Sequence, residues 1–289
     1  MPLNKNKIYS IGIDVGGSKI SGVLFDGRRV IGDYTLATPH DNFHHFLIML
    51  AAVVGPLLDK ARQDKIKIDG IGLGIAGMVD GKKGKILKSA NIPYLDDKNI
   101  ALEVSKKIGL PTRLDNDAKC FVRAEAKKGA GEKFKNVYGI TLGTGIGGGW
   151  WVNNEIYEGA HGGANEPGHM IIDYAQGIDL EGAYHKLMQN NPAKLAEEAY
   201  RGDRLAEKAY EEFGRLLGVA FANIANLLDP EIFIIGGSVV KSSDLFLGAA
   251  KKTMLEYAIS PAAKKIKVTE GKLGDFAGAI GAALLFCDI

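Results

Sequence analysis

Hydrophobic and polar positions follow two spacings along the chain, and the first of them predicts a sheet. Residues 8–15, 21–27 and 28–38 are short apolar runs of the length and composition typical of strands. The pair Asp26–Gly27 suits a tight turn between the second and the third run. Because no helix fits between these runs, they predict an antiparallel meander.

The second spacing places apolar side chains three and four residues apart, which predicts helices. It is clearest over residues 42–63, where aromatic and aliphatic side chains share one face. Beyond this helix we expect a buried strand at 70–77, a helix at 98–108, and a strand at 111–117 that runs into a helix near Ala118. Strands that alternate with helices in this way indicate an α/β fold.

A second copy of the opening plan begins at residue 137, with the sequence VYGITLGTGIGGGWWVNNEIYEG. Each copy has a glycine-rich loop after its first strand, but the copies share little identity, so the repeat is architectural. A helix-rich stretch, two further strands and a closing small-residue helix follow, at 178–228, 231–240, 265–271 and 274–287. We therefore expect two α/β lobes with a central cleft, a smaller one of residues 1–117 plus 275–289 and a larger one of 118–274.

Three glycine turns, each directly after a predicted strand, suggest sites where phosphate approaches the backbone. They are Gly16–Gly17, Gly143–Gly149 and Gly236–Gly237. Glycine permits close approach, so that successive N–H groups can point at one anion. Ser18 and Thr144 add hydroxyl groups beside these turns. Neither a Rossmann fingerprint nor a P-loop fits, because no helix follows the second turn and no Gly-Lys-Ser/Thr is present.

Acidic side chains accompany two of the strand ends. Asp14 interrupts a buried strand just before Gly16, where a carboxylate would hold Mg²⁺, through water, beside a phosphate. The segment LDNDAKC places Asp115, Asn116 and Asp117 at a strand-to-helix junction. Asp and Asn are ordinary N-caps, but a cap needs only one of them. Phosphoryl transfer to an alcohol requires a base, for which Asp117 suits, with Asn116 holding the hydroxyl and Asp115 structural.

Composition adds limits on partners and compartment. The chain has 289 residues, a net charge of +2 and 24% charged residues, so nothing indicates a nucleic-acid partner. Two cysteines make no disulfide framework and favour a reducing, cytoplasmic setting, with Cys120 expected to be buried. We expect no signal peptide, because Asp14 interrupts the first apolar run, and no membrane span.

Ordered segments over nearly the whole chain resemble the motifs of the ROK sugar kinases, a family within the actin-like, hexokinase-like ATPases. The segments are GIDVGGSK, GLGIAGMVDG, SANIP, LDNDAKC, GITLGTGIGGGWWVNNEIYEGAHGGANEPGH, IIGGSVV and GDFAGAIGAAL. The resemblance implies the two-lobed actin-like, ribonuclease H-like ATPase fold. It also implies a kinase that uses ATP and Mg²⁺ on a hexose and pairs as a homodimer.

Roles for individual residues follow from the resemblance. It implies that ATP phosphates and adenosine contact Asp14, Gly16, Gly17, Ser18, Lys19, Gly143, Thr144, Gly145, Gly147, Gly236 and Gly237. It implies that the sugar contacts Gly77, Asn91, Asn116, Asp117, Glu166, His169 and Glu181, with Asp117 as the catalytic base. Amide and carboxylate side chains suit this task, because they bind hydroxyl groups in pairs.

Three features depart from the family pattern. Many members carry a cysteine-rich zinc motif after the histidine, whereas residues 171–184 contain no cysteine, so we expect no structural zinc. His169 is then either a sugar ligand or a core histidine. Asn165 replaces the usual glycine, which the turn tolerates because asparagine also adopts positive φ. Pro167 stiffens the loop around Glu166.

The sequence thus predicts an ATP-dependent hexokinase-type enzyme, with glucose phosphorylated at its 6-hydroxyl as the leading reaction. Fructose, mannose and N-acetylhexosamines stay open as acceptors, and ADP or polyphosphate as donors. A sugar-responsive repressor is disfavoured, because such members carry a DNA-binding helix-turn-helix ahead of the first phosphate loop. We expect the roughly ten residues before Asp14 to be too few for such a module. A non-catalytic sugar-binding protein is disfavoured by the presence of both Asp14 and Asp117.

Overall fold

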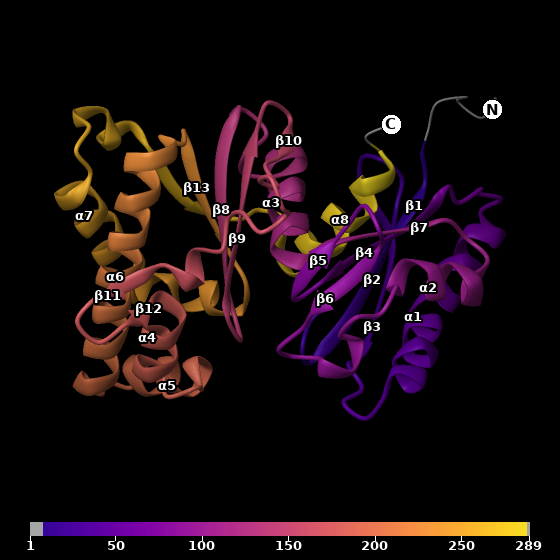
Figure 1. The fold of residues 1–289 in the computed structure, drawn as a ribbon, viewed down its shortest axis with the longest axis horizontal. Helices are drawn as coiled ribbons and strands as arrows, with labels where there is room; N and C mark the ends of the chain where they lie inside the picture. The colour runs from indigo at the N-terminus through magenta and orange to yellow at the C-terminus, as the bar shows by residue number, and fades with distance from the viewer. Residues whose placement is uncertain (1–7, 288–289) are drawn as a thin grey trace. The chain divides into compact units, whose positions relative to one another are not determined.

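The structure is a computed structural model that describes residues 8–287, and its residue contacts divide the chain into two compact units (Figure 1). Unit 1 comprises the chain up to Gly129, the segment Gly159–Gly163 and the chain from Lys272 onward. Unit 2 comprises Ala130–Glu158 and Ala164–Gly271. Each unit is built on its own mixed sheet, which agrees with the predicted α/β class.

The boundary between the units differs from the predicted one at residues 117 and 118. The helix α3 (Asp117–Lys128) belongs to unit 1 rather than to the larger lobe. The reason is packing, because α3 lies against α8 (Ala277–Ala283) in the same unit. The chain therefore leaves unit 1 after this helix and not before it.

The sheet of unit 1 has the strand order β3-β2-β1-β4-β7. Its strands are β1 (Ser10–Val15), β2 (Lys19–Phe25), β3 (Val30–Ala37), β4 (Gly70–Ile75) and β7 (Thr112–Asn116). The first three form the predicted antiparallel meander, while β4 and β7 run parallel to β1. The carboxyl ends of β1, β4 and β7 therefore meet at one edge of the sheet.

Two helices, α1 (Phe43–Gln63) and α2 (Ile100–Ile108), belong to the core that covers one face of this sheet. Asn42 caps α1 by accepting a hydrogen bond from the backbone N–H of His45 at 2.9 Å. Among the described residues α1 is the one helix long and apolar enough to cross a membrane by length and composition. Its buried side chains, which include Phe46, Leu50 and Val54, pack against the strands of the sheet.

The opposite face of the sheet is covered by α8, which approaches the strands through glycine and alanine. A Cβ atom on Gly12 would lie 1.9 Å from the carbonyl oxygen of Ala279, and one on Gly72 would lie 1.8 Å from that of Ala282. Since no side chain fits in such a space, these glycines allow helix and strand backbones to touch. The small-residue pattern of the C-terminal segment therefore serves close packing.

Unit 2 repeats the plan of unit 1 with the strand order β10-β9-β8-β13-β14. Its strands are β8 (Asn136–Leu142), β9 (Ile146–Val152), β10 (Glu155–Ile156), β13 (Ile232–Gly236) and β14 (Lys267–Glu270). As in unit 1, an antiparallel meander is followed by two parallel strands. The predicted architectural repeat is therefore confirmed.

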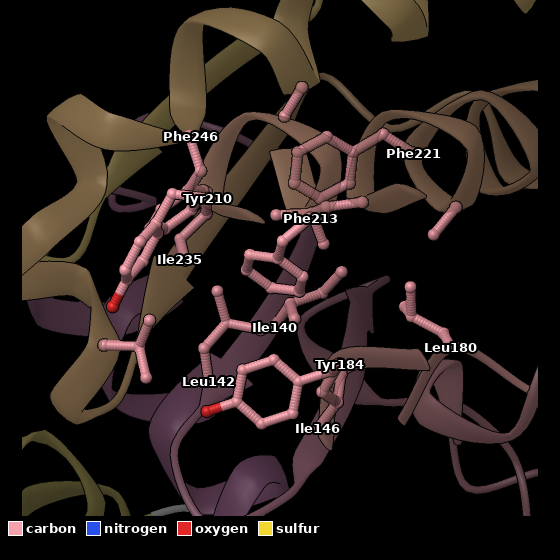
Figure 2. Packing of buried hydrophobic residues seen from close by; sticks show 14 of the residues in the cluster. Ile140, Leu142, Ile146, Leu180, Tyr184, Tyr210, Phe213, Phe221, Ile235 and Phe246 are labelled. Atoms are coloured by element: carbon pink, nitrogen blue, oxygen red, sulfur yellow. The ribbon is translucent and has the colours of Figure 1, made fainter. Parts of the chain in front are cut away.

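The helices of unit 2 enclose an aromatic core. They are α4 (Leu180–Leu187), α5 (Pro192–Tyr200), α6 (Arg204–Leu228) and α7 (Leu247–Tyr257). Figure 2 shows Tyr210, Phe213, Phe221 and Phe246 in the upper part of the view and Tyr184 below Ile140 and Leu142 of the sheet, and all of them belong to one buried cluster. The hydroxyl group of Tyr184 leaves this core and donates a hydrogen bond to the carbonyl of Gly143 at 2.7 Å. The core thus holds the first residue of the second glycine loop.

Two short hairpins were not expected from the sequence. They are β5 (Met78–Asp80) with β6 (Lys85–Lys88), and β11 (Ile171–Asp173) with β12 (Ile178–Asp179). Short 3₁₀ segments lie at Pro93–Leu95, Pro167–His169, Ser238–Leu245, Pro261–Lys265, Gly274–Phe276 and Leu284–Phe286. The second hairpin lies within residues 171–184, the stretch that contains no cysteine.

Candidate active site

Two acidic side chains lie near each other at the carboxyl edge of the unit 1 sheet. Asp14 is the penultimate residue of β1, and Asp117 is the first residue of α3, directly after β7. Only β4 separates these two strands in the sheet. The pKa of Asp14 is raised to about 7, first by burial and then by the negative charge of Asp117, while Lys19 opposes the shift. Ligands of open α/β sheets bind at this edge of the strands.

Asp117 itself is suited to take up a proton near neutral pH. Burial raises its pKa to about 6, against the lowering effect of the backbone N–H groups of Ala118 and of Asp117 itself. A general base works best when its pKa lies near the working pH. The position and environment of Asp117 therefore fit the predicted base.

The capping of α3 explains how Asp117 stays available. Asn116 caps the helix, because its side-chain oxygen accepts from the backbone N–H of Lys119 at 3.0 Å. Its amide group donates to the carbonyl of Gly77, also at 3.0 Å. Asp115 is buried and forms an ion pair with Arg123 at 2.5 Å, as its predicted structural role requires. Of the three polar residues, Asp117 alone is used neither as cap nor in the ion pair.

The first glycine loop is a tight turn between β1 and β2. The N–H of Gly16 donates to the carbonyl of Lys19 at 3.0 Å, and the hydroxyl of Thr38 donates to the carbonyl of Gly16 at 2.7 Å. Ser18 and Lys19 are exposed at its tip. A Cβ atom on Gly17 would lie 3.5 Å from that of Asn91, so the loop passes close to this predicted sugar ligand.

Unit 1 therefore gathers one group of the predicted site residues. Asn91 is exposed, and Gly77 adopts a φ of +139° close to the carbonyl of Lys88, which would lie 2.5 Å from an added Cβ. This group consists of Asp14, Gly16, Gly17, Ser18, Lys19, Gly77, Asn91, Asn116 and Asp117.

The second glycine loop, in unit 2, is held by side chains of α4. The N–H of Gly143 donates to the carbonyl of Gly145 at 3.0 Å, which closes the turn between β8 and β9. A carboxylate oxygen of Glu181 accepts from the N–H of Ile146 at 2.5 Å. The same oxygen would lie 2.5 Å from a Cβ atom on Gly145. Glu181, predicted from the resemblance as a sugar ligand, therefore binds the backbone of this loop.

A pocket of about 240 Å³ opens beside this loop within unit 2. Its lining consists of Gly143, Thr144, Tyr184, His185, Met188, Asn190, Pro192 and Ser238. Gly237, just before Ser238, has a φ of +90° and would meet the carbonyl of Leu142 at 2.2 Å if it carried a Cβ atom. Sequence reasoning named the glycines and Thr144 but missed the lining from α4, because nothing in the sequence pairs that helix with the loop.

The remaining predicted sugar ligands also gather in unit 2. His169 is exposed, so it is not a core histidine, and its Nδ1 lies 3.0 Å from a carboxylate oxygen of Asp179. The pKa of His169 is raised, first by this hydrogen bond and then by the negative charges of Glu181, Asp179 and Glu166. Glu166, His169 and Glu181 therefore share one electrostatic environment. Asp179, which also caps α4, was not predicted.

The loop before His169 accommodates two of the three departures from the family pattern, Asn165 and Pro167. Asn165 has a φ of +68°, as its replacement of glycine requires, and its amide donates to the carbonyl of Tyr157 at 2.7 Å. Pro167 is buried against β9, where a Cβ atom on Gly148 would lie 2.7 Å from the ring. Within residues 8–287, no group of three or more histidine, cysteine or acidic side chains is arranged to hold a metal ion.

The repeated five-stranded plan of the two units, with a glycine loop after the first strand of each, defines the class of actin-like ATPase folds. The chain belongs to the ROK family, whose sequence profile matches residues 10–183 and 173–289.

Individual relatives are named as sugar kinases. The chain is 29% identical over 306 residues to the N-acetyl-D-glucosamine kinase of Mannheimia succiniciproducens, covering 95% of this chain and 98% of the relative. It is 29% identical over 312 residues to the glucokinase of Streptomyces coelicolor, covering 95% and 96%. A ROK glucokinase from Streptomyces griseus, solved with glucose and AMPPNP, is 27% identical with a TM-score of 0.79 and covers 96% of this chain and 98% of that one.

Proposed function

We propose that the protein is an ATP-dependent sugar kinase that transfers the γ-phosphoryl group to a hydroxyl of a hexose, with Asp117 as the general base. The observation that carries the proposal is the placement of Asp14 and Asp117 at one edge of the unit 1 sheet, both with raised pKa. Phosphoryl transfer needs a proton acceptor and a cation site in this kind of proximity. Family membership and the names of the relatives support the same reaction.

In the proposed reaction Asp117 takes the proton of the attacking sugar hydroxyl while the oxygen of that hydroxyl bonds to the γ-phosphorus. The bond from this phosphorus to the bridging oxygen of ATP breaks, which leaves ADP and a sugar phosphate. Release of this proton from Asp117 to solvent restores the base. Such a base contributes about 10²–10⁴-fold to the rate.

Asp14 fits the task of holding Mg²⁺ through water. Its carboxylate is desolvated and repelled by Asp117, so a cation would stabilise its charged form. Mg²⁺ bound there would neutralise charge on the phosphates during transfer. The exposed Lys19, which already lowers the pKa of Asp14, would supply a further positive charge near the first glycine loop.

For the nucleotide, we propose the glycine loops and the pocket of unit 2. The phosphate oxygens would lie against Gly16, Gly17 and Ser18 of the first loop and against Gly143, Thr144, Gly145 and Gly147 of the second. The donors would be backbone N–H groups of these loops other than those of Gly16 and Gly143, which close the two turns. The pocket between Thr144 and Ser238 would take the adenosine, next to Gly236 and Gly237. The AMPPNP complex of the relative from S. griseus supports ATP as donor.

For the sugar, the proposed ligands are Gly77, Asn91, Asn116, Asp117, Glu166, His169 and Glu181. Glucose, phosphorylated at its 6-hydroxyl, is the leading acceptor, because the Asn116, Asp117 and Glu166 ligands implied by the resemblance are all present. N-acetylhexosamines are the main alternative, because several relatives are named as kinases for them. Fructose and mannose follow. A cytoplasmic homodimer is part of the same proposal.

A substrate panel tests the proposal. The purified protein is supplied with MgATP and, separately, glucose, fructose, mannose, N-acetylglucosamine, N-acetylgalactosamine and N-acetylmannosamine, and ADP release and sugar phosphate are both measured. Release of ADP that depends on one sugar and matches the phosphate formed supports the kinase. Sugar binding without phosphate formation on any member would instead support a non-catalytic sugar-binding protein.

A further inference from the structure

The segment Gly159–Gly163 belongs to unit 1, although the chain on both sides of it belongs to unit 2. Its base is closed by a hydrogen bond from the N–H of Ala164 to the carbonyl of Glu158 at 3.3 Å. The amide of Asn165 adds a second bond, to the carbonyl of Tyr157 at 2.7 Å. The segment is thus the tip of a closed loop, and Glu166 follows directly after that base.

The tip is held by Lys119, the third residue of α3. Lys119 is 5% exposed, and its ammonium group donates to the carbonyl of Gly162 at 3.1 Å. Within residues 8–287 no carboxylate forms an ion pair with it, so a backbone carbonyl is the recorded partner of a buried charge. A buried ammonium group is costly unless it is hydrogen-bonded, which favours keeping this bond.

The geometry of both ends makes the contact specific. The backbone N–H of Lys119 donates to Asn116, the cap of α3, so the lysine is anchored in the first turn of the helix that begins with Asp117. Gly162 has a φ of +79°, a conformation that favours glycine. Lys119 therefore lies two residues after Asp117, the proposed catalytic base. The segment that it holds ends at Gly163, three residues before the proposed sugar ligand Glu166.

We propose that Lys119 is a positioning residue for sugar binding: by fixing the carbonyl of Gly162 it holds the loop that presents Glu166. This inference rests on the proposed function and deepens it. It differs from a simple structural role, because loss of the bond is expected to weaken sugar binding while leaving nucleotide binding and the fold intact.

The test compares three substitutions with a matched control. Lys119→Met and Lys119→Gln remove the bond, the first with an apolar side chain and the second with a polar one that is too short. Lys119→Arg keeps a long cationic donor. Lys128→Met places the same change on the exposed end of the same helix. For each protein KM for the hexose, KM for ATP and kcat are measured, together with hydrogen exchange of peptides covering residues 158–166.

We expect Lys119→Met and Lys119→Gln to raise KM for the hexose about tenfold, as loss of one hydrogen bond to a charged group would. KM for ATP stays within about twofold, amide exchange accelerates in residues 158–166 alone, and Lys119→Arg restores most of both properties. Lys128→Met behaves as the unsubstituted protein. If one loss variant does not fold, the other carries the comparison.

Unchanged exchange, unchanged KM for the hexose, or a fall confined to kcat in the loss variants would overturn the inference. So would an equal effect of Lys128→Met. Failure of the proposed function has a different signature: the unsubstituted protein then phosphorylates no sugar. That result would end the role of Lys119 in sugar binding, while the exchange data would still report whether it holds the loop.

Discussion

The two glycine loops occupy equivalent places in the two sheets and differ in what surrounds them. In unit 1, β1 pairs with β2 up to Val15 and Ile20, and in unit 2, β8 pairs with β9 up to Leu142 and Ile146. One residue before the closing pair, β1 has Asp14 and β8 has Thr141, so these two residues occupy equivalent positions. The first loop therefore follows an acid, whereas the second follows a neutral hydroxyl residue.

The loops are also held in place differently. The first is held by Thr38, whose hydroxyl donates to the carbonyl of Gly16, and the tip of this loop is exposed. The second is held from α4, by Glu181 and by the hydroxyl of Tyr184. One backbone plan thus serves two tasks: in unit 1 it places a desolvated acid suited to a cation beside the loop, and in unit 2 it holds a turn beside a pocket.

Among the changes that compare the two loops, the largest effect is expected when the acid of the first loop is neutralised. Asp14→Asn should reduce kcat by about 10²–10³-fold, the range seen when one group that stabilises transition-state charge is lost. Thr141→Val, at the equivalent place in unit 2, should change kcat by less than about threefold, because no charge is removed. Steady-state kinetics of both variants with saturating MgATP check the comparison, and equal effects would contradict the division of tasks.

Next in size is the loss of the buried ion pair behind the acidic edge. Arg123→Met would leave Asp115 buried and unpaired, so the free energy of unfolding should fall by about 3 kcal/mol or more. Arg215→Met removes an exposed pair with Glu211 in α6 and should cost under about 1 kcal/mol. Urea unfolding of both variants measures the difference, and similar midpoints would mean that the Asp115 pair adds little.

Alanine at one glycine of each loop separates the two loops by packing. On Gly145 the added Cβ atom would meet the carboxylate of Glu181 at 2.5 Å, whereas on Gly16 its nearest neighbour is the carbonyl of Lys19 at 3.6 Å. Gly145→Ala should therefore raise KM for ATP about tenfold, as expected when one clamping hydrogen bond of the loop is displaced. Gly16→Ala should stay within about threefold, so a larger effect at Gly16 would contradict the rigid second loop.

The smallest effect concerns stability and pH. The pKa of Asp14 is about 7 in the folded protein and 3.8 ordinarily, so the folded state binds the proton more tightly and loses stability as pH rises between these values. Asp14→Asn removes this loss, and should raise the free energy of unfolding by about 1 kcal/mol or more at pH 8 and hardly at pH 4. Thermal unfolding without Mg²⁺ measures it, and the opposite sign would mean that the Asp14 charge is stabilised.

Most of the fold could be predicted because local signals agreed with the tertiary structure. Period-2 and period-3.6 patterns placed the two meanders and α1, and the glycine turns marked the ends of β1 and β8. The hairpins β5–β6 and β11–β12 could not be predicted, because their strands are too short to show a period. The first segment of unit 1 ends after α3 because this helix packs against α8, a contact that the sequence does not show.

The candidate site divides in the same way. Asp14 and Asp117 could be proposed as candidates because an acid at a strand end is a local feature. The bond from Asn116 to Gly77 and the clamp role of Glu181 join segments 39 and 35 residues apart, and the partner of His169 lies ten residues away, so the sequence holds no local signal for these contacts. Lys119 was passed over for the same reason, since its partner, Gly162, lies 43 residues away.

The most direct measurement compares sugar affinity with turnover in Asp117→Asn. Asparagine keeps the shape of the side chain but cannot accept the hydroxyl proton. We expect kcat to fall by about 10²–10⁴-fold while the Kd for the hexose, measured by calorimetry, stays within about threefold. In the unsubstituted protein kcat/KM should fall as pH drops through about 6, the pKa of Asp117. An Asp117→Asn enzyme that turns over at the original rate would show that Asp117 is not the general base.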